Sequence, residues 1–545
     1  MSSKQAWGSR LGVILAVAGS AVGLGNFLRF PGNAAQNGGG AFMIPYFCAL
    51  LLLGIPIGWA EWTMGRYGGR KGFHSAPAIM GVWGKGSIAR YLGGIGILIP
   101  VAVYFWYVLV ESWCLAYCWD YLVHGGIGLD PAQSIPEQVQ TSSAHFLDFT
   151  GQASNGSNFA GGISESLVFW IVSTIANVWL IYRGLSRGIE TFCKWAMPAM
   201  AVCGIVVLVR VLTLGTPDPA HPDQNVVAGL GYMWNPDFSA LSNAETWLAA
   251  AGQIFFSLSV GFGVIINYSS YMKRKDDVVL SGLTASATNE FFEVALGGLI
   301  TLTAAVAFMG IATTTANTGG TFSTGFNALP VVFAHMPAGR FFGGIWFFML
   351  WLAAITSSLS MLQPAQAFLE EALGMAKNAA TSVLVLVCLA GNVFVLWFSK
   401  GLVALDTLDF WVGTFMIFVM AGVQVICFAW VVGMERGMKE AHEGAQMRIP
   451  AFYRFIIKYV SPLYLLAVFG AFCWQKVPGY VTQILGDESA GIPPNHDVLM
   501  TWLVIFGLIA AIAVITALGV RRWRAQGLDV DGTRPPDDEV APAKR

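Results

Sequence analysis

Two stretches of small and polar residues interrupt otherwise apolar segments, and they mark the places where this chain could bind an ion or a solute. The first runs from Gly19 to Asn26 and the second from Ser257 to Gly263. Glycine weakens a helix by about 1 kcal/mol relative to alanine, so we expect both helices to break there. The freed amide groups favour a carboxylate, and the freed carbonyls suit a hard cation such as sodium.

Oxygen-bearing side chains within the two stretches and in later apolar segments could supply further ligands for a cation. They belong to Asn26, Ser257, Asn289, Thr356, Ser357 and Ser358. Small residues in a single such segment are also typical of close helix packing in a membrane. Two matching segments, each at the start of a block of five apolar spans, favour a transporter site at the bilayer midplane, because unwound backbone is tolerated there only around a cavity.

Five charged residues occur within or at the edges of apolar segments: Arg29, Glu61, Glu111, Glu293 and Asp409. Charge is costly inside a bilayer, so such residues indicate function. A purely structural ion pair is the alternative for Arg29 with Asp409. Ordinary internal polar contacts are an equal alternative for Glu61 and Glu111, since buried polar groups need partners wherever they lie.

The composition places these residues in a membrane protein. Of 545 residues, 55% are hydrophobic and 11% are charged, against roughly 25% charged in soluble domains. A crossing takes about 20 apolar residues. We therefore predict an all-α membrane protein with about twelve transmembrane helices, near 11–35, 41–65, 89–122, 166–182, 190–213, 242–268, 279–308, 341–369, 379–397, 401–433, 453–475 and 497–520. The net charge of −1 gives no indication of a nucleic-acid partner.

Charge asymmetry between the loops orients the crossings. Segment 124–165 holds acidic residues and no lysine or arginine, whereas basic clusters occupy 273–275 and 521–524. The positive-inside rule then predicts a multi-pass protein of the plasma membrane, in a bacterium the inner membrane, with both termini cytoplasmic. We expect 1–10 to form a cytoplasmic N-terminus and 523–545, where the chain turns polar, to form a disordered cytoplasmic tail.

Cysteine and histidine do not indicate a disulfide framework, a metal centre or an enzyme. The eight cysteines lie in apolar runs without a CxxC pair, as expected of small buried hydrophobic residues. The seven histidines lie near loops and form no HExxH helix. An intramembrane enzyme would need a nucleophile–base pair or a metal triad, so we predict no enzymatic activity and no organic cofactor.

Several strings of residues resemble the neurotransmitter:sodium symporter family. They are WGSRLG (7–12), AVGLGNFLRFP (21–31), NGGGAF (37–42), EWTMGR (61–66), GQIFFSLS (252–259), LSGLT (280–284), TSS (356–358), QP (363–364) and DFW (409–411). The resemblance covers all the predicted crossings in order. It implies a LeuT-type 5+5 inverted repeat with discontinuous helices 1 and 6. The ten-helix transport core would then span 11–433, and helices 11 and 12 with their loops would span 434–522.

The resemblance also implies two sodium sites and a substrate site. One sodium site would comprise the Ala21 carbonyl, Asn26, Ser257, Asn289 and the substrate carboxylate. The other would comprise carbonyls of Gly19, Val22 and Ala353 with the hydroxyls of Thr356 and Ser357. The substrate carboxylate would meet amides around Leu24 and Gly25 and the Tyr107 hydroxyl, and its amine would meet oxygens around Ala21, Phe256, Ser257 and Ser357. The substrate side chain would lie among Val103, Phe256, Ser259, Phe262 and Met361.

The glycine at position 23 indicates which class of substrate to expect. Amine-carrying relatives have an aspartate at this position, whereas a glycine leaves room for a carboxylate on the substrate itself. The resemblance therefore implies a neutral, mainly hydrophobic L-amino acid. Ser20 and Met361 depart from the leucine-carrying pattern, and both would loosen the pocket and admit aromatic substrates.

Gating and chloride roles also follow from the resemblance. Arg29 and Asp409 resemble an outer gate. Lys4 and Glu371 align with an inner pair in which lysine replaces the usual arginine, and a point charge lacks the bidentate fork. Chloride-dependent relatives have a serine in place of Glu293, and their other chloride ligands correspond to Tyr46, Gln253, Ser257 and Asn289. The Glu293 carboxylate would therefore substitute for chloride.

Together these features predict a chloride-independent, sodium-coupled secondary active symporter of neutral, mainly hydrophobic L-amino acids that works by alternating access. An ion channel is a rival, but it would need a filter of carbonyl or charge rings, and no such string occurs. A receptor that binds an amino acid without moving it is a rival that the sequence leaves open. The exact amino acid, the coupling stoichiometry and the existence of a homodimer are left open as well.

Overall fold

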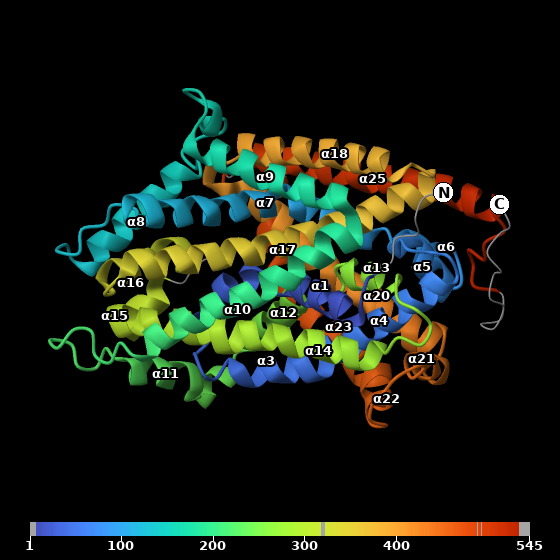
Figure 1. Cartoon of the computed structure of the whole chain (residues 1–545), viewed down its shortest axis with the longest axis horizontal. Helices are drawn as coiled ribbons and strands as arrows, with labels where there is room; N and C mark the ends of the chain where they lie inside the picture. Colours follow the sequence, from blue (N-terminus) through green and yellow to red (C-terminus); the bar gives the residue numbers. More distant parts are fainter. Residues whose placement is uncertain (1–6, 318–321, 488, 492, 534–545) are drawn as a thin grey trace.

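The computed structural model describes residues 7–317, 322–487, 489–491 and 493–533. Over these ranges the chain is helical and contains no β-strand, apart from one isolated bridge between Gly39 and Pro236. Most of the long helices run side by side along the longest axis (Figure 1). Helices α5, α6 and α21 lie at one end, called the α5 end below, and α8, α11 and α16 lie at the other (Figure 1).

The helices differ widely in length. The longer elements and those around the breaks are α1 (Arg10–Ala21), α2 (Phe30–Gln36), α3 (Met43–Ala49), α4 (Ile55–Arg70), α7 (Ile95–Trp119), α9 (Glu165–Gly184), α10 (Thr191–Leu212), α12 (Ala244–Leu258), α13 (Val264–Ser269), α14 (Val278–Glu290), α15 (Leu299–Asn317), α17 (Gly339–Leu373), α18 (Lys377–Trp397), α20 (Met416–Ile426), α23 (Ser461–Gln475) and α25 (His496–Ala525). The others are α5 (Ala76–Trp83), α6 (Ser87–Leu92), α8 (Ile135–Phe149), α11 (Val226–Trp234), α16 (Leu329–His335), α19 (Val403–Leu408), α21 (Met434–Ala441), α22 (Tyr453–Phe455) and α24 (Val477–Leu485).

In the described ranges, nine helical runs are long and apolar enough to cross a membrane, and one bent pair raises the number to ten. The nine are Met43–Arg70, Ser87–His124, Glu165–Leu212, Val278–Asn317, Gly339–Leu373, Lys377–Trp397, Lys400–Val431, Tyr453–Gln475 and His496–Ala525. The prediction of about twelve separate crossings differs at two places. The fourth and fifth predicted crossings form one continuous run, Glu165–Leu212. The sixth is divided into α12 and α13, because the chain unwinds between them.

The first predicted break is confirmed between α1 and the helical turn η1 (Gly25–Arg29). Helix α1 ends where Val22 adopts an extended conformation, with φ −73° and ψ 95°. The two arms, Arg10–Ala21 and Gly25–Gln36, meet at 47°. The first arm has no amide of its own to cover its last carbonyls, so these groups depend on partners from other helices.

The second predicted break lies between α12 and α13. Ser259, Gly261 and Gly263 have positive φ values of 54°, 80° and 86°. At Gly263 a Cβ atom would also lie 2.1 Å from the Gly96 carbonyl oxygen. Glycine is required there for both reasons, because other residues rarely adopt this conformation and α7 begins too close to admit a side chain.

Long helices hold the two breaks against each other. Helix α7 carries Tyr107 and helix α17 carries Thr356 and Ser357, and these two long helices pack against each other. The helical turn η7 (Phe291–Gly298) continues α14 and passes the first break closely. A Cβ atom on Gly297 would lie 2.0 Å from the Asn26 carbonyl oxygen. This close approach brings Glu293, one turn earlier on η7, next to Asn26.

The outer helices present apolar side chains outward. Leu386 on α18 is 67% exposed, Leu463 on α23 is 68% exposed and Leu503 on α25 is 62% exposed. Extended apolar exposure of this kind is typical of a surface that contacts another apolar phase. It supports the assignment of these helices to a lipid environment.

The ordered part of the chain extends beyond residue 522, the boundary expected from the sequence. Helix α25 runs to Ala525, and Val530 is buried at 5% exposure. Arg90 donates to the Val530 carbonyl at 2.7 Å and pairs with Asp531. Residues 523–533 are therefore packed rather than disordered, because Arg90 supplies them with partners that the sequence pattern did not reveal. Residues 534–545 lie outside the described ranges.

Candidate functional site

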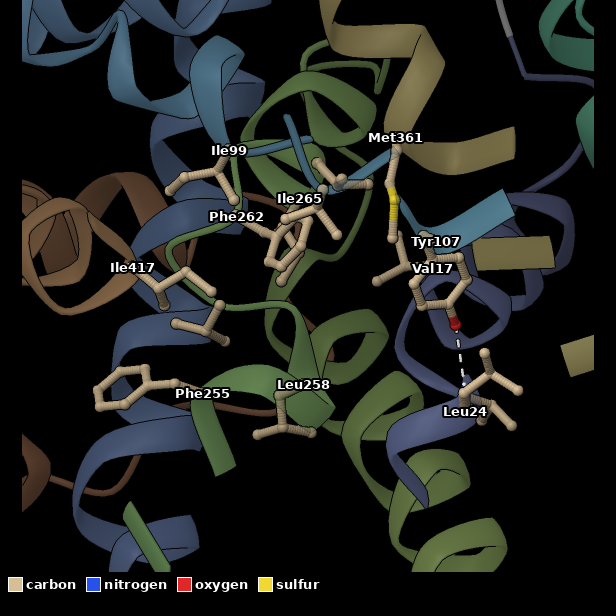
Figure 2. Close-up of a cluster of buried hydrophobic side chains, with 14 of the residues drawn as sticks. Val17, Leu24, Ile99, Tyr107, Phe255, Leu258, Phe262, Ile265, Met361 and Ile417 are labelled. Atoms are coloured by element: carbon tan, nitrogen blue, oxygen red, sulfur yellow. Dashed lines mark hydrogen bonds between the residues drawn. The ribbon is translucent and has the colours of Figure 1, made fainter. Parts of the chain in front are cut away.

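The amide groups freed by the first break have side-chain partners. The Gly23 N–H donates to Asn26 Oδ1 at 2.8 Å, and the Leu24 N–H donates to the Tyr107 hydroxyl oxygen at 3.1 Å (Figure 2). All four residues are buried. Polar side chains thus stand where a carboxylate could take over the same hydrogen bonds.

The two glycines of this break are needed for close approach. A Cβ atom on Gly23 would lie 2.7 Å from the Tyr107 hydroxyl oxygen and 2.8 Å from Ser357 Oγ. A Cβ atom on Gly25 would lie 2.8 Å from Cδ1 of Phe256. An aspartate in place of Gly23 would therefore displace the two hydroxyl groups that line the break.

Three side chains expected at the first sodium site form one hydrogen-bonded chain. Asn26 Nδ2 donates to Asn289 Oδ1 at 2.8 Å, and Asn289 Nδ2 donates to Ser257 Oγ at 2.7 Å. All three are essentially inaccessible, with exposures of 0% or 1%. Helices from both halves of the chain thus bring these oxygen-bearing groups together.

Glu293 lies within the same cluster and accepts hydrogen bonds from four side chains. Gln253 Nε2 donates to Oε1 at 2.7 Å, and the donors to Oε2 are Asn289 Nδ2 at 3.1 Å, Asn26 Nδ2 at 3.2 Å and the Ser257 hydroxyl. Three of these residues are the ones expected to hold a chloride ion in relatives. A ring of donors around one buried carboxylate is the arrangement that an anion requires.

The fourth expected chloride ligand, Tyr46, has a different acceptor. Its hydroxyl donates to Glu290 Oε2 at 2.7 Å. Glu290 precedes Glu293 by one helical turn, so the two carboxylates lie on one face of the helix. Glu290 was not among the residues predicted from the sequence, although a second acid three residues before Glu293 in an apolar segment was a usable signal.

The second expected sodium site gathers oxygens from α1 and α17. Ser357 Oγ lies 3.3 Å from the Gly19 carbonyl oxygen, 3.1 Å from that of Ser20 and 3.4 Å from that of Val22. The Thr356 hydroxyl donates to the Ala353 carbonyl at 3.0 Å. Neutral oxygens of this kind suit a hard cation. Within the described residues, no group of three or more His, Cys, Asp or Glu side chains could hold a metal ion.

The expected side-chain pocket is mainly apolar. Val103 is fully buried, Phe262 is 3% exposed and Met361 is 5% exposed. Figure 2 shows Met361 extending toward Tyr107, and Phe262 and Ile265 belong to the same cluster of buried side chains.

Three serines add a polar patch beside the unwound segments. Ser360 Oγ donates to Ser20 Oγ at 2.6 Å, and the Ser259 hydroxyl donates to the Ser20 carbonyl at 3.2 Å. Ser360 was missed in the sequence analysis, although it lies one helical turn from Ser357 and Thr356 and therefore on the same side of α17.

Arg29 and Asp409, the expected outer gate, do not form an ion pair. The Arg29 guanidinium lies over the Phe256 ring, 4.6 Å from its centroid. Asp409 Oδ1 is buried and has no hydrogen-bond partner in the described part of the protein. The two charged side chains thus do not meet.

The other acids of the apolar segments have internal partners. Glu61 accepts from the Gly261 amide at 3.2 Å and from the Gln424 side chain at 2.5 Å. Glu111 accepts from Asn177 at 2.9 Å and from Ser358 at 2.6 Å. Glu61 thereby covers an amide that the second break leaves free, and Glu111 fixes the residue that follows Ser357.

Of the expected inner pair, Lys4 and Glu371, only Glu371 lies within the described residues. Glu371 Oε1 accepts from the Ser75 hydroxyl at 2.8 Å, and Oε2 accepts from the Ser75 amide at 3.0 Å. Lys4 lies outside the described residues. Glu371 thus caps the start of α5 with its carboxylate.

The family model, the sequence relatives and a solved structure all point to the same group of transporters. A model of the "Sodium:neurotransmitter symporter family" matches residues 4–523. The chain is 31% identical, over 96% of its length and 98% of the relative, to an uncharacterized sodium-dependent transporter of Methanocaldococcus jannaschii. It is 24% identical, over 85% of its length and 50% of the relative, to the sodium- and chloride-dependent GABA transporter ine of Drosophila melanogaster. The crystal structure of MhsT in complex with L-phenylalanine is similar, with a TM-score of 0.70 and 25% identity over 86% of this chain and all of MhsT.

The fit around Gly23 can be tested by stability. We expect Gly23→Ala to lower the unfolding temperature, because the new methyl group would overpack the Tyr107 and Ser357 hydroxyls at a cost of about 1–3 kcal/mol. Gly252→Ala is the matched control, since a Cβ atom on Gly252 of α12 has nothing within 4 Å. Tyr107→Phe should relieve part of the loss in a double-mutant cycle followed by thermal unfolding. An equal change of unfolding temperature in Gly23→Ala and Gly252→Ala would contradict the close packing inferred around Gly23.

Proposed function

This chain belongs to the sodium:neurotransmitter symporter family, and we propose that it couples the uptake of a neutral, mainly hydrophobic L-amino acid to the movement of two sodium ions. The observation that carries the proposal is the first break, where the Leu24 amide, the Tyr107 hydroxyl and Ser357 converge around Gly23. A substrate carboxylate would replace the hydrogen bond between Leu24 and Tyr107. Its amine would meet oxygens around Ala21, Phe256, Ser257 and Ser357.

An apolar substrate side chain fits the lining of Val103, Phe262 and Met361, all buried. Each buried methylene group would gain about 0.8 kcal/mol. Leucine, isoleucine, valine and methionine are therefore the first candidates. Because Met361 is flexible, and because MhsT is known with bound L-phenylalanine, aromatic amino acids are included in the proposed range.

We further propose that transport is independent of chloride. Two sodium ions and a zwitterion bring two positive charges into a site without water, where charge is costly. The Glu293 carboxylate accepts four hydrogen bonds beside the proposed first sodium site and would balance one of these charges. Since a fixed carboxylate cannot leave with the cargo, a proton would neutralise it during the return step.

The proposed topology has twelve crossings arranged as two inverted blocks of five followed by two more. The run Glu165–Leu212 has 48 residues and would extend about 70 Å, more than twice the thickness of a bilayer core. Gly184 interrupts it with φ 80°, so we assign it to two crossings. Counting α12 with α13 as one broken crossing completes the twelve. The α5 end would face the cytoplasm of a bacterial cell.

The substrate class can be tested by uptake into vesicles. We expect labelled L-leucine to accumulate when an inward sodium gradient is imposed and to stop accumulating when potassium replaces sodium. Neutral apolar amino acids should compete, whereas the decarboxylated amine of leucine should not, because it lacks the carboxylate that fits beside Gly23. Binding without accumulation would favour a receptor, and competition by the amine alone would contradict the proposed substrate class.

The second sodium site can be tested with Thr356→Ala and Ser357→Ala. We expect the double variant to lose sodium-stimulated binding, and Thr356→Ala alone to raise the half-saturating sodium concentration about tenfold or more. Thr381→Ala is the matched control, since its buried hydroxyl donates to the Lys377 carbonyl at 2.9 Å on the peripheral helix α18. An unchanged sodium requirement in the double variant would refute the site.

Chloride independence can be tested in gluconate buffer. We expect wild-type uptake to be indifferent to the replacement of chloride, and Glu293→Ser to require chloride, because the anion would restore the missing charge among the same donors. Glu111→Ser is the control, since it removes another buried acid outside this cluster and should not create a chloride requirement. A wild-type protein that stops without chloride would overturn the proposal.

A further inference from the structure

A cavity of about 620 Å³ lies at the α5 end, away from the two breaks. It lies between the last turn of α4, the turn after α5, the segment after α13 and helix α21. Its lining is mainly charged and aromatic and includes Tyr67, Trp83, Lys85, Arg436 and Lys439. Its volume is typical of sites for small ligands.

The lining carries an excess of positive charge. Five of the lining residues are lysine or arginine, and only two are acidic. Burial lowers the pKa of His442, as do the charges of Arg448 and Arg454. His442 Nε2 also accepts a hydrogen bond from the Ile449 amide at 3.0 Å, so this ring is neutral near pH 7.

Both carboxylates are already paired. Glu440 pairs with Arg70 at 2.6 Å, and Glu443 pairs with Arg70 at 2.8 Å and with Arg274. Partial burial raises the pKa of Glu443, but the hydrogen bond from Arg274 and the charge of Arg70 outweigh it and leave the pKa below its ordinary value. Glu443 is therefore ionised, and its negative charge is compensated by Arg70 and Arg274.

Three further cations have no such partner. Among the described residues, Lys85, Arg436 and Lys439 take part in no ion pair with a carboxylate. Arg436 Nη2 donates to the Tyr67 hydroxyl at 3.2 Å. Lys85 has a positive φ of 51°, a conformation that lysine adopts only at a cost. Three unpaired cations on one small cavity repel each other unless an anion joins them.

The cavity is rigidly built rather than a gap between loops. Arg66 is fully buried beneath it and donates to the backbone carbonyls of Asp276 and Glu443, each at 2.6 Å. One guanidinium thus ties the end of α4 to two other segments. The Tyr67 and Trp83 rings pack edge to face, with centroids 5.2 Å apart, and form an aromatic wall.

We propose that this cavity binds a phosphate-bearing anion, with Lys85, Arg436 and Lys439 as its ligands. Phosphate carries more charge and more acceptor oxygens than a carboxylate, so a single group can satisfy several cations at once. Arginine also matches phosphate geometry through its planar fork. The phosphate could belong to a lipid headgroup or to a soluble ion, and the same cations would hold either one.

Two probes distinguish the sources. Inorganic pyrophosphate is titrated by calorimetry against the full-length protein in nanodiscs of phosphatidylcholine. Retention of phosphatidylglycerol, compared with phosphatidylcholine, is measured by native mass spectrometry of the purified protein. Pyrophosphate binding would identify a soluble phosphate, and selective retention of phosphatidylglycerol would identify a lipid headgroup, so either result supports the site.

The variants separate the cavity from the general charge of this face. We expect Arg436→Gln with Lys439→Gln to weaken binding of the active probe about tenfold or more. Lys273→Gln with Lys275→Gln is the matched control, because it removes two exposed charges of the neighbouring segment outside the cavity. Arg436→Lys with Lys439→Arg keeps both charges and should bind well.

Lys85→Gly provides a test that does not depend on the stability of the double variant. Glycine relieves the strained backbone, so we expect unfolding temperature to stay constant or rise while binding weakens. Failure of both probes to bind the wild type, or equal losses in the cavity and control variants, would overturn the proposal.

Discussion

Inside a bilayer there is no water to satisfy a broken helix, so every amide and carbonyl that a break exposes must find a partner within the protein. The two unwound segments of this chain concentrate that requirement at its centre. Tyr107 and Asn26 cover amides of the first break, Ser357 meets carbonyls of α1, and Glu61 covers the Gly261 amide. The packing of α4, α7 and α17 around the breaks follows from the need to deliver these side chains.

The same requirement explains why some buried acids belong to the site and others support it. Glu61 and Glu111 each accept from two groups of neighbouring helices and hold the elements that carry the site. Glu293 differs, because its donors Asn26, Ser257 and Asn289 are themselves the expected cation ligands. A carboxylate that shares its donors with the proposed cation site would interact with a bound cation, because an opposite charge within about 4–6 Å favours the ionised form.

The contacts of the segments that flank the breaks differ between the two sides of the breaks. At the α5 end, Trp7 donates to the Tyr268 carbonyl at 3.0 Å, Arg10 pairs with Asp277 at 3.4 Å, and Glu371 caps the start of α5. On the other side of the breaks, the Arg29 and Asp409 charges do not meet. An asymmetry of this kind is what alternating access needs, since one side of a central site can open only if the contacts on the other side hold.

Local sequence determined the features that depend on neighbours along the chain. The runs of glycine and serine predicted the positions of both breaks correctly. These residues, glycine above all, have a low helix propensity and therefore mark where a helix unwinds. The apolar runs and the oxygen-bearing residues near the breaks were also evident. Asn289 was identified as a neighbour of Glu293, since it lies one helical turn before it on the same face, whereas Gln253 and Ser257 were expected only from the family resemblance.

Only the tertiary structure decided which residues meet across the bundle. It paired Tyr46 with Glu290, joined Ser360 to Ser20, left Arg29 over Phe256, and packed residues 523–533 against Arg90. It also assembled the basic cavity from Arg70 and Arg436, which are hundreds of positions apart. Periodicity and composition describe one helix face at a time, whereas these contacts depend on how helices cross, which is set by the packing of the whole bundle.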